Sequence, residues 1–594
     1  MGFGLSLRGD ASTLFINEYP VFTLKATLDG KSPETRIELI TQTLQGVELK
    51  PPLTVTATQR GIWVRYGHIN VVRVTTQEAK LQGLPAMDLA ISWKNKIEYA
   101  LGLPPLQAAN NYLTIGVGGT VIGRLVGSEA QLATFSAVNA EVVKLEKVLG
   151  GVKVIGLKTG DTEVRVASPN GKTRFVVKVA DSAVLDAEGL EARVFGTPPS
   201  PDAVNSAVTQ AIVQDMKVAP NATIEVLGVE YQSIPVGQVR KIKVNVRVRA
   251  ARHMTFEGPV FVSVTNLAQE RIKESELWYS NMPERVSRPG PLFSADLMFG
   301  KAVRMLFHHQ NATANPMTVQ IVAYNVSPTP AQIMLIRGDG EPDEDPVRSG
   351  LAGAEQFLSS WLKSDSILVT IPPFSKLPIN ARRLGTEYVT SGLLYMNLMA
   401  GGPKSVRLQT EAVSGSDIAD WEPATRSGLP WTAVKAKTIS RYPSTARDSL
   451  IFSKPFREVK AEYSVGGKFA FVRIGQHAIP SLDDRSSLDG NFGVLYSVRT
   501  RLSNPTVESQ MVELAFEASA GYSAALFVID GVKLVLPRIL SKQELQVKSI
   551  RLAPGETRIL SLLTIPLSGS SYPATLTMRI VDQTKPQPSA MLLP

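Results

Sequence analysis

Residues 162–179 contain the feature that most constrains how this chain can fold. Apolar and polar side chains alternate in residues 162–166 and again in residues 174–179, which is the pattern of strands that bury one face of a sheet. Between the two runs stands Ser168-Pro169-Asn170-Gly171, and an Asn-Gly pair tolerates the positive φ angles of a tight hairpin turn. The segment therefore predicts an antiparallel β-hairpin.

Further strands precede this hairpin. Residues 113–117 alternate before Gly118-Gly119, residues 139–145 read Asn-x-x-Val-Val-x-Leu, and residues 156–166 read Gly-x-x-x-Gly-Asp-Thr-x-Val-x-Val. These sequences resemble the group-2 bacterial immunoglobulin-like domains and the related N-terminal module of pilus-formation proteins. The resemblance implies an Ig-like β-sandwich over residues 107–182 in a bacterial protein outside the cytoplasm, and it brings no catalytic residue with it.

The length of 594 residues is too great for one hydrophobic core, because single cores stop growing at about 250 to 300 residues. We therefore expect four or five domains. Hydrophobic residues make up 44% of the chain and charged residues 20%, which is the composition of folded domains. The 45 Gly and 39 Pro residues favour many short strands joined by turns over long helices.

Residues 11–106 predict a small α/β domain. Ser32-Pro33-Glu34 combines a capping serine with proline at the first helical position, so a helix is expected from there to Gln45. Two more helices are expected at residues 76–81 and 85–101. The apolar face of the last helix is expected to include Met87, Ala90, Ile97 and Leu101.

Three short sequences in this region resemble the extracytoplasmic N-terminal segment of some bacterial mechanosensitive-channel homologues. They are Val21-Phe22-Thr23-Leu24 with Arg36, Val74-Thr75-Thr76-Gln77-Glu78-Ala79, and Leu89-Ala90-x-x-Trp93-x-x-x-Ile97. The resemblance implies a location outside the inner membrane. It does not imply channel activity, because the membrane helices of the channel are missing from this chain.

The remaining residues predict a mainly β architecture of tandem antiparallel sandwiches. Residues 183–220 are expected to be a connector with one helix, residues 221–440 a β-sandwich region with one helix, and residues 441–594 a C-terminal β-sandwich. Asn311 to Pro316 and Asn504-Pro505 each lead into two strands. This echo predicts two related sandwiches, with a chance match between β-rich segments as the alternative.

The most regular strand carries a basic stripe. Ile242, Val244, Val246 and Val248 alternate with cations, which then lie about 6 to 7 Å apart along one face. Such a stripe could bind an anionic polymer such as a surface polysaccharide. A solvent-exposed face whose charges discourage aggregation is the simpler interpretation. The candidate anion-binding residues are Lys241, Lys243, Arg247 and Arg249.

An acidic loop follows residue 338. It holds five carboxylates within seven residues, and Ca²⁺ prefers six to eight oxygen ligands, so a surface calcium site at Asp339, Asp343 and Asp345 is one interpretation. A solvated acidic turn is the favoured one, since Pro342 and Pro346 stiffen the segment and no calcium-loop spacing is present. No other cofactor is expected.

An irregular Pro-rich stretch from Ile418 to Pro443 contains the candidate glycan-stacking residues Trp421, Trp431 and Tyr442. The alternative, which we favour, is that these rings fill the space between two domains.

Several functional classes lack their signatures in the sequence. Cysteine is absent, so disulfides, thiolate zinc sites and cysteine nucleophiles are excluded. No run of apolar residues is long enough for a membrane helix, and Met1 to Ser12 does not have the pattern of a signal peptide. The paired His308-His309 would face opposite sides of a strand and could not chelate one metal. No nucleophile elbow or metalloprotease motif occurs.

We therefore expect a non-enzymatic, extracytoplasmic bacterial protein that is a structural or adhesive component of the cell surface or of a surface assembly. Protein partners or self-association are expected, and an anionic polysaccharide is a further candidate. Nucleic acid is not, because no aromatic residues are interleaved with the basic stripe. The alternatives are a carbohydrate-binding protein of the cell envelope and a hydrolase acting on polysaccharides or esters.

Overall fold

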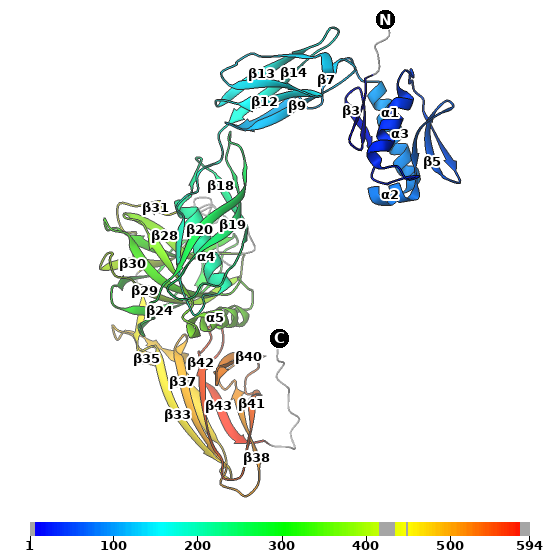
Figure 1. Cartoon of the computed structure of the whole chain (residues 1–594). Coiled ribbons are helices and arrows are strands. Elements are labelled where there is room, and N and C mark those ends of the chain that lie inside the picture. The colour runs from blue at the N-terminus through cyan, green and yellow to red at the C-terminus, as the bar shows by residue number, and fades with distance from the viewer. Residues whose placement is uncertain (1–5, 415–433, 447–448, 582–594) are drawn as a thin grey trace. The chain divides into compact units, whose positions relative to one another are not determined.

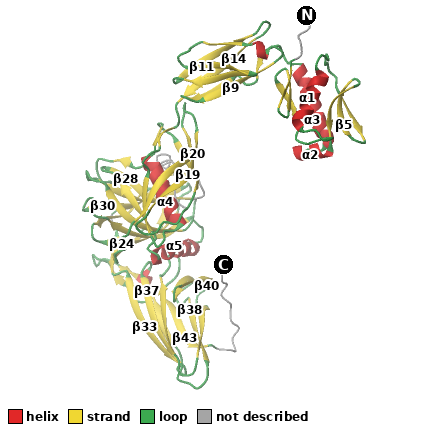
Figure 2. Ribbon diagram, in the orientation of Figure 1, coloured by secondary structure: helices red, strands yellow, loops and turns green. Residues whose placement is uncertain are grey.

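The computed structural model describes residues 6–414, 434–446 and 449–581, and strands predominate throughout these residues (Figures 1 and 2). The chain forms two compact units. The first comprises Met1–Ala183 with Ala219–Ala222 and Arg249–Phe256, and the second comprises the remainder. The predicted fold class is confirmed: the protein is mainly β and multidomain, with antiparallel sandwiches and a small N-terminal α/β domain.

The N-terminal domain places helices between two small sheets (Figure 1). One sheet consists of β1 (Leu7–Asp10), β2 (Thr13–Ile16) and β3 (Tyr19–Thr23), and the other of β4 (Thr54–Thr58), β5 (Gly61–Tyr66) and β6 (Ile69–Val74). The helices are α1 (Pro33–Leu44), α2 (Thr76–Gln82) and α3 (Ala86–Leu101).

Local signals explain where these helices begin. The Ser32 hydroxyl accepts a hydrogen bond from the Thr35 backbone N–H at the start of α1, so the predicted capping role of Ser32 is confirmed. The predicted apolar face of α3 is only partly correct. Ala90 and Ile97 are buried, whereas Met87 is 41% exposed.

Residues 107–180 form a small sandwich with two four-stranded sheets. Their strand orders are β10-β13-β14-β8 and β11-β12-β9-β7. The strands are β7 (Gln107–Ala108), β8 (Tyr112–Gly116), β9 (Thr120–Val126), β10 (Thr134–Ala137), β11 (Val143–Val148), β12 (Gly151–Gly156), β13 (Gly160–Ala167) and β14 (Lys172–Ala180).

The predicted hairpin is present as β13 and β14, but its turn differs from the expected one. Neither Asn170 nor Gly171 has a φ in the left-handed region. The turn is held instead by Glu129, whose carboxylate accepts hydrogen bonds from the Ser168 hydroxyl at 2.7 Å and from the Asn170 backbone N–H at 2.9 Å. Hydrogen bonds to Glu129, which is distant in the sequence, thus hold this turn without the positive φ angles that a tighter turn would need.

The second unit begins with a sandwich made of an 11-stranded sheet and a five-stranded sheet. The order in the larger sheet is β18-β19-β20-β16-β27-β26-β29-β24-β21-β32, with β22 beside β24, and in the smaller sheet it is β23-β30-β25-β28-β31. The strands up to β25 are β16 (Glu191–Phe195), β18 (Thr223–Val229), β19 (Val239–Arg249), β20 (Phe256–Asn266), β21 (Glu274–Ser280), β22 (Arg285–Val286), β23 (Gly290–Met298), β24 (Ala302–Asn311) and β25 (Met317–Asn325). The later strands are β26 (Ala331–Asp339), β27 (Ser366–Ile371), β28 (Ser375–Leu384), β29 (Val389–Leu398), β30 (Ser405–Ser414), β31 (Lys437–Thr438) and β32 (Leu450–Ser453).

The segment expected to be a connector, residues 183–220, is instead part of this sandwich. Its strand β16 pairs with β20 on one side and β27 on the other, so it lies inside the larger sheet. Its helix α4 (Pro201–Asp215) packs on the same sheet, as does α5 (Pro346–Leu362). The connector prediction was wrong because the sequence of the short strand β16 does not indicate that it pairs with β20 and β27, which are distant in the chain.

The C-terminal sandwich packs a five-stranded sheet, β33-β37-β42-β39-β40, against a four-stranded sheet, β34-β43-β38-β41. It starts later than predicted, because β32 pairs with β21 in the preceding sandwich. Its strands are β33 (Phe456–Ser464), β34 (Ala470–Ile474), β37 (Leu495–Ser503), β38 (Gln510–Glu517), β39 (Ser523–Ile529), β40 (Val532–Ile539), β41 (Glu544–Leu552), β42 (Thr557–Thr564) and β43 (Ala574–Ile580).

The two sandwiches of this unit share a repeated corner built on a buried asparagine. At Asn504, between β37 and β38, the side-chain N–H groups donate to the carbonyls of Glu508, Leu552 and Ala553. The side-chain oxygen accepts from Thr506. Because β37 and β41 lie in opposite sheets, Asn504 ties the two sheets together at this end.

Asn311 and Asn325 make the same bonds in the preceding sandwich. Asn311 donates to the carbonyls of Asn315, Leu384 and Gly385, and Asn325 donates to those of Thr329, Ile371 and Pro372. In each case the chain is crossing from one sheet to the other. The echo between Asn311 and Asn504 in the sequence therefore corresponds to a real structural repeat, and it recurs a third time at Asn325.

Candidate functional site

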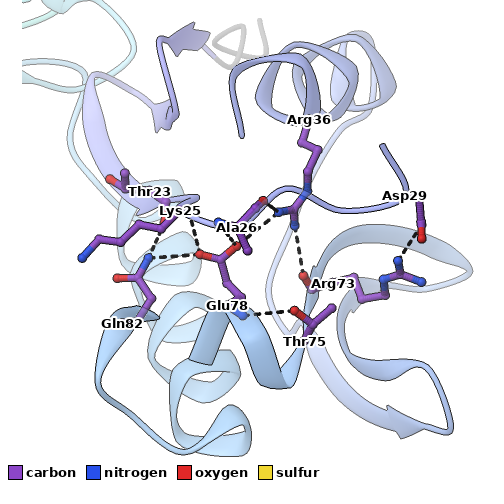
Figure 3. Close-up of polar contacts among 9 residues, drawn as sticks. All are labelled: Thr23, Lys25, Ala26, Asp29, Arg36, Arg73, Thr75, Glu78 and Gln82. Carbon is purple, nitrogen blue, oxygen red and sulfur yellow. Dashed lines mark hydrogen bonds and ion pairs between the residues drawn. The ribbon is translucent and has the colours of Figure 1, made fainter. Parts of the chain in front are cut away.

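Two of the three sequences that resemble channel homologues, the one at residues 21–24 with Arg36 and the one at residues 74–79, meet around Glu78 in the N-terminal domain (Figure 3). Thr75 caps α2 by accepting a hydrogen bond from the Glu78 backbone N–H, which fixes the start of the helix. The Glu78 carboxylate, fully buried, then accepts bonds from the backbone N–H groups of Lys25 at 2.7 Å and Ala26 at 3.1 Å. The helix start is thereby joined to the chain that leaves β3.

Arg36 completes this cluster from α1. Its guanidinium donates to Glu78 Oε2 at 3.2 Å, to the Ala26 carbonyl at 2.5 Å and to the Arg73 carbonyl on β6 at 3.4 Å. Beside it, Phe22 stacks on Trp93 with ring centroids 4.9 Å apart. Each polar atom of the Glu78 carboxylate already has partners inside the domain, so this cluster can hold the fold together but offers no free group for chemistry.

A second buried ion pair lies in the other unit. Arg304 on β24 and Glu274 at the start of β21 are both fully buried, and their side chains are 2.9 Å apart. Arg304 also donates to the carbonyls of Pro455 and Gly493, which belong to the C-terminal sandwich. The Arg304 side chain, which belongs to the sandwich that contains β24, therefore satisfies backbone carbonyls of the C-terminal sandwich.

Aromatic and cationic side chains surround this pair. The Trp361 indole donates to Glu274 Oε1 at 2.7 Å, and the Arg271 guanidinium lies 3.9 Å from the Trp361 ring centroid. Burial lowers the pKa of Arg271, whereas the pKa of Glu274 is lowered because Arg304 and Arg271 outweigh the cost of burying its charge. Trp361 therefore makes a polar contact in addition to packing against the hydrophobic core.

A cluster of titratable side chains with shifted pKa values lines a small cavity between α4, α5 and β26. Burial raises the pKa of Asp339 and of Asp365, and it lowers the pKa of Arg337 to about 10. Shifted groups in a cavity are candidates for catalysis. The cavity, however, holds about 70 Å³, far below the roughly 300 Å³ or more of ordinary ligand pockets. It has room for a few water molecules and not for a sugar or an ester.

The basic stripe lies on β19 as predicted, with Ile242, Val244, Val246 and Val248 fully buried on the opposite face. Acidic neighbours compensate much of its charge. Lys243 pairs with Glu230, Arg247 pairs with both Glu225 and Glu257, and Lys241 lies 5.0 Å from the Phe261 ring centroid. Arg249 ends the strand. The anion-binding site stays a prediction. The positive electrostatic potential at the basic stripe is weaker than the sequence implied, because the neighbouring segments supply carboxylates.

The acidic loop does not gather its carboxylates. Asp339 is buried against Arg382 at 2.9 Å, Asp343 pairs with Arg348, and Asp345 caps α5 and pairs with Arg538. Within residues 6–414, 434–446 and 449–581, no group of three His, Asp or Glu side chains is placed to hold a metal ion. The calcium candidate is corrected accordingly, since each aspartate is turned toward its own cation or backbone N–H.

Of the glycan-stacking candidates, Trp421 and Trp431 lie outside the described residues. Tyr442 is half-buried, with Arg407 4.7 Å from its ring centroid. The paired histidines occupy β24 as expected: His309 is fully buried and bonds to Ser280, while His308 lies 3.7 Å from Glu284. None of the described helices is long and apolar enough to span a membrane.

Sequence reasoning missed Glu274, Arg304 and Glu78 as key polar residues. Arg304 stands in the apolar first part of β24, residues 302–307, and a lone charge in such a run was the available signal. Glu78 stands three residues after Thr75, the spacing of a helix-start motif, although its carboxylate bonds to another segment instead of its own helix.

Comparison with known proteins gives limited information. A family model described as a domain of unknown function (DUF8459) matches residues 13–102, which are the N-terminal domain. No curated protein matches the chain.

Among solved structures, the insect immune protein hemolin is 10% identical, with 64% of this chain and 83% of that chain covered and a TM-score of 0.17. Human protocadherin-24 EC1-2 is 11% identical, with 28% and 97% covered and a TM-score of 0.12. An endo-fucoidan hydrolase of glycoside hydrolase family 107 is 9% identical, with 31% and 39% covered and a TM-score of 0.16. Similarities of this size do not assign the chain to a functional class.

Proposed function

We propose that the protein is a non-enzymatic structural or adhesive component of a bacterial cell surface or surface assembly, located outside the cytoplasm. The observation that carries this proposal is the junction at Arg304. Its buried guanidinium binds Glu274 in one sandwich and two backbone carbonyls of the next. The hydrophobic core is also continuous across both sandwiches, from Phe357 to Phe516.

Such a junction stiffens the connection between two domains. Linked domains normally move relative to one another unless their interface is large and apolar. Here Gly350 of α5 approaches the Ser568 backbone so closely that a Cβ atom on Gly350 would lie 2.1 Å from the Ser568 carbonyl oxygen. Stiff joints suit a load-bearing or spacing role. Asp339 and Asp365, whose pKa values burial raises, lie in a cavity too small for a substrate, which supports a role without catalysis.

The proposal is tested with the purified full chain. We expect higher-order assembly by light scattering and electron microscopy, or retention on bacterial cell envelopes, and we expect Arg304→Met to reduce both. A chain that stays monomeric at every concentration and is not retained on envelopes would contradict the proposal. Arg485→Met, at an exposed position of the C-terminal sandwich, is the matched control.

A carbohydrate-binding role is the second candidate, and a groove beside α4 favours it. This groove holds about 420 Å³, a ligand-sized volume. Its lining includes the amide side chain of Gln332, which can donate to and accept from sugar hydroxyls, whereas the Gln214 amide already bonds to the Val434 carbonyl and the Ala436 backbone N–H. Binding on a glycan array that is lost in Gln332→Ala would support this role, and an array without signal would remove it.

A further inference from the structure

The four edge strands of the C-terminal sandwich differ in how they are protected. An unpaired strand edge can pair with a strand of another chain, and proteins usually block such edges with charges, proline or bulges. Edge strand β33 exposes Glu458, Lys460 and Glu462, and edge strand β40 exposes Lys533, Pro537 and Arg538. Edge strand β41 is bulged where it pairs with β38.

Edge strand β34 is less protected: it has no proline and no bulge, and its single charged side chain, Arg473, donates a hydrogen bond to Thr575 on the neighbouring strand β43. Two large apolar side chains stand on it or directly before it: Phe471 is 55% exposed and Phe469 is 57% exposed. Their rings lie 6.1 Å apart. Among the described residues, β34 has one strand partner, β43, so the backbone of its other edge has no strand beside it.

The side chains of β34 are also ordered so that the strand is complementary to an antiparallel copy of itself. Val472 and Ile474 face the core, while Phe471 and Arg473 face outward on either side of Val472. If two copies of β34 pair antiparallel about a two-fold axis at Val472, Phe471 of each copy lies opposite Arg473 of the other. A guanidinium over an aromatic ring is favourable, and this chain already uses the arrangement at Arg271 on Trp361.

We infer that β34 is the edge through which two copies of this chain associate, by antiparallel pairing centred on Val472. The inference rests on the proposed structural role and names a contact that would serve it. The partner is a second copy of the chain, because Phe471 and Arg473 of one β34 complement Arg473 and Phe471 of another. A two-fold interface requires a surface that is complementary to itself in this way. The strand has five residues, so a weak, concentration-dependent dimer is expected.

Sedimentation of the full chain tests the association. The mass is expected to rise from 64.3 kDa towards a dimer over concentrations from roughly 1 to 500 μM, a range suited to weak pairing. Phe471→Lys should weaken dimerisation at least tenfold, since it adds like charge beside Arg473. Val532→Lys places the same new charge at an exposed position of edge strand β40 and should leave dimerisation unchanged.

Crosslinking tests the register, helped by the absence of cysteine from the natural chain. A mixture of Phe471→Cys chains and Arg473→Cys chains should form disulfide-linked dimers under mild oxidation, because the two positions lie opposite each other. Either variant alone should crosslink much less. Equal crosslinking of single variants, or an unchanged dimer in Phe471→Lys, overturns the inference. A strictly monomeric chain that is still retained on envelopes overturns it while leaving the proposed function intact.

Discussion

Asn311 and Asn504 stand at equivalent corners of two different sandwiches and make matching hydrogen bonds. Each donates to a carbonyl four residues ahead and to two carbonyls at the end of a strand in the opposite sheet. Each also accepts from a threonine two residues ahead. The same hydrogen-bonded corner therefore occurs in two different sandwiches and does not depend on the residues of the surrounding core.

Removing one such corner should destabilise its sandwich. Asn504→Ala removes the side-chain donor to the carbonyls of Glu508, Leu552 and Ala553 and the acceptor for Thr506, so we expect the free energy of unfolding to fall by about 2 to 4 kcal/mol. Urea denaturation measures this. Asn504→Asp should behave similarly because a carboxylate cannot donate. Asn315→Ala, at an exposed position, should have little effect, and an equal loss there would contradict the role of the corner.

The Arg304 junction makes a separate prediction about cooperativity. Arg304→Met leaves Glu274 buried without its main cation, and breaking a buried pair in this way costs about 3 to 5 kcal/mol. We expect calorimetry to show the C-terminal sandwich melting apart from its neighbour. Arg304→Met combined with Glu274→Leu should recover part of the loss, since the buried Glu274 carboxylate is then removed and only Arg271 loses a partner. A single unchanged transition in Arg304→Met would show that the apolar core alone couples the sandwiches.

In the first unit, Glu78→Gln should destabilise the N-terminal domain. The new amide N–H₂ would face the N–H groups of Lys25 or Ala26 or the Arg36 guanidinium, placing donor against donor. We expect a loss of about 3 kcal/mol in that domain and none in the second unit. Glu38→Gln, at an exposed position of α1, is the control. The two variants are compared by thermal unfolding.

His309 predicts a pH dependence of stability. Burial lowers its pKa from 6.5 to about 4 in the folded protein. Between these values the unfolded chain binds a proton that the folded chain does not, so the free energy of unfolding falls as the pH drops through this window and levels off below it. The full effect is about 3 kcal/mol.

Urea midpoints measured from pH 7.5 to 4 test the His309 effect. The difference between the native chain and His309→Gln reports the His309 effect together with the small part of the Glu284 pKa shift that His309 causes. Glu284 and His308, which lie beside His309, are present in both chains. His477→Gln, at an exposed position, should keep the native slope. If His309→Gln also keeps that slope, another group is responsible.

Local patterns predicted the elements that depend on neighbouring residues. Ser32-Pro33 marked the start of α1, and the alternation of residues 242–248 placed four valine and isoleucine side chains in the core. These features succeed because capping and strand alternation act over a few residues.

Long-range features could not be predicted in the same way. Glu274 and Arg304 meet because the fold places β21 beside β24, and neither residue carries a local mark of the other. The exposed face of β34 was equally invisible: Phe471 and Val472 alternate, and only the register shows that Val472 lies opposite the buried Leu576 while Phe471 is on the outward face. The candidate site depends on such placements, so it required the structure.

The position of β16 inside the larger sheet has a consequence for biosynthesis. Val194 pairs with Asn266 on one side and with Ile367 on the other. A ribosome delivers Val194 long before Ile367, so β16 must wait, partly unpaired, while the intervening strands emerge. Contacts so distant in sequence slow folding, because the closure entropy of a long loop is lost before the contact forms. The larger sheet of this sandwich therefore cannot be completed progressively from its N-terminal end, because β16 needs β27 as its second neighbour.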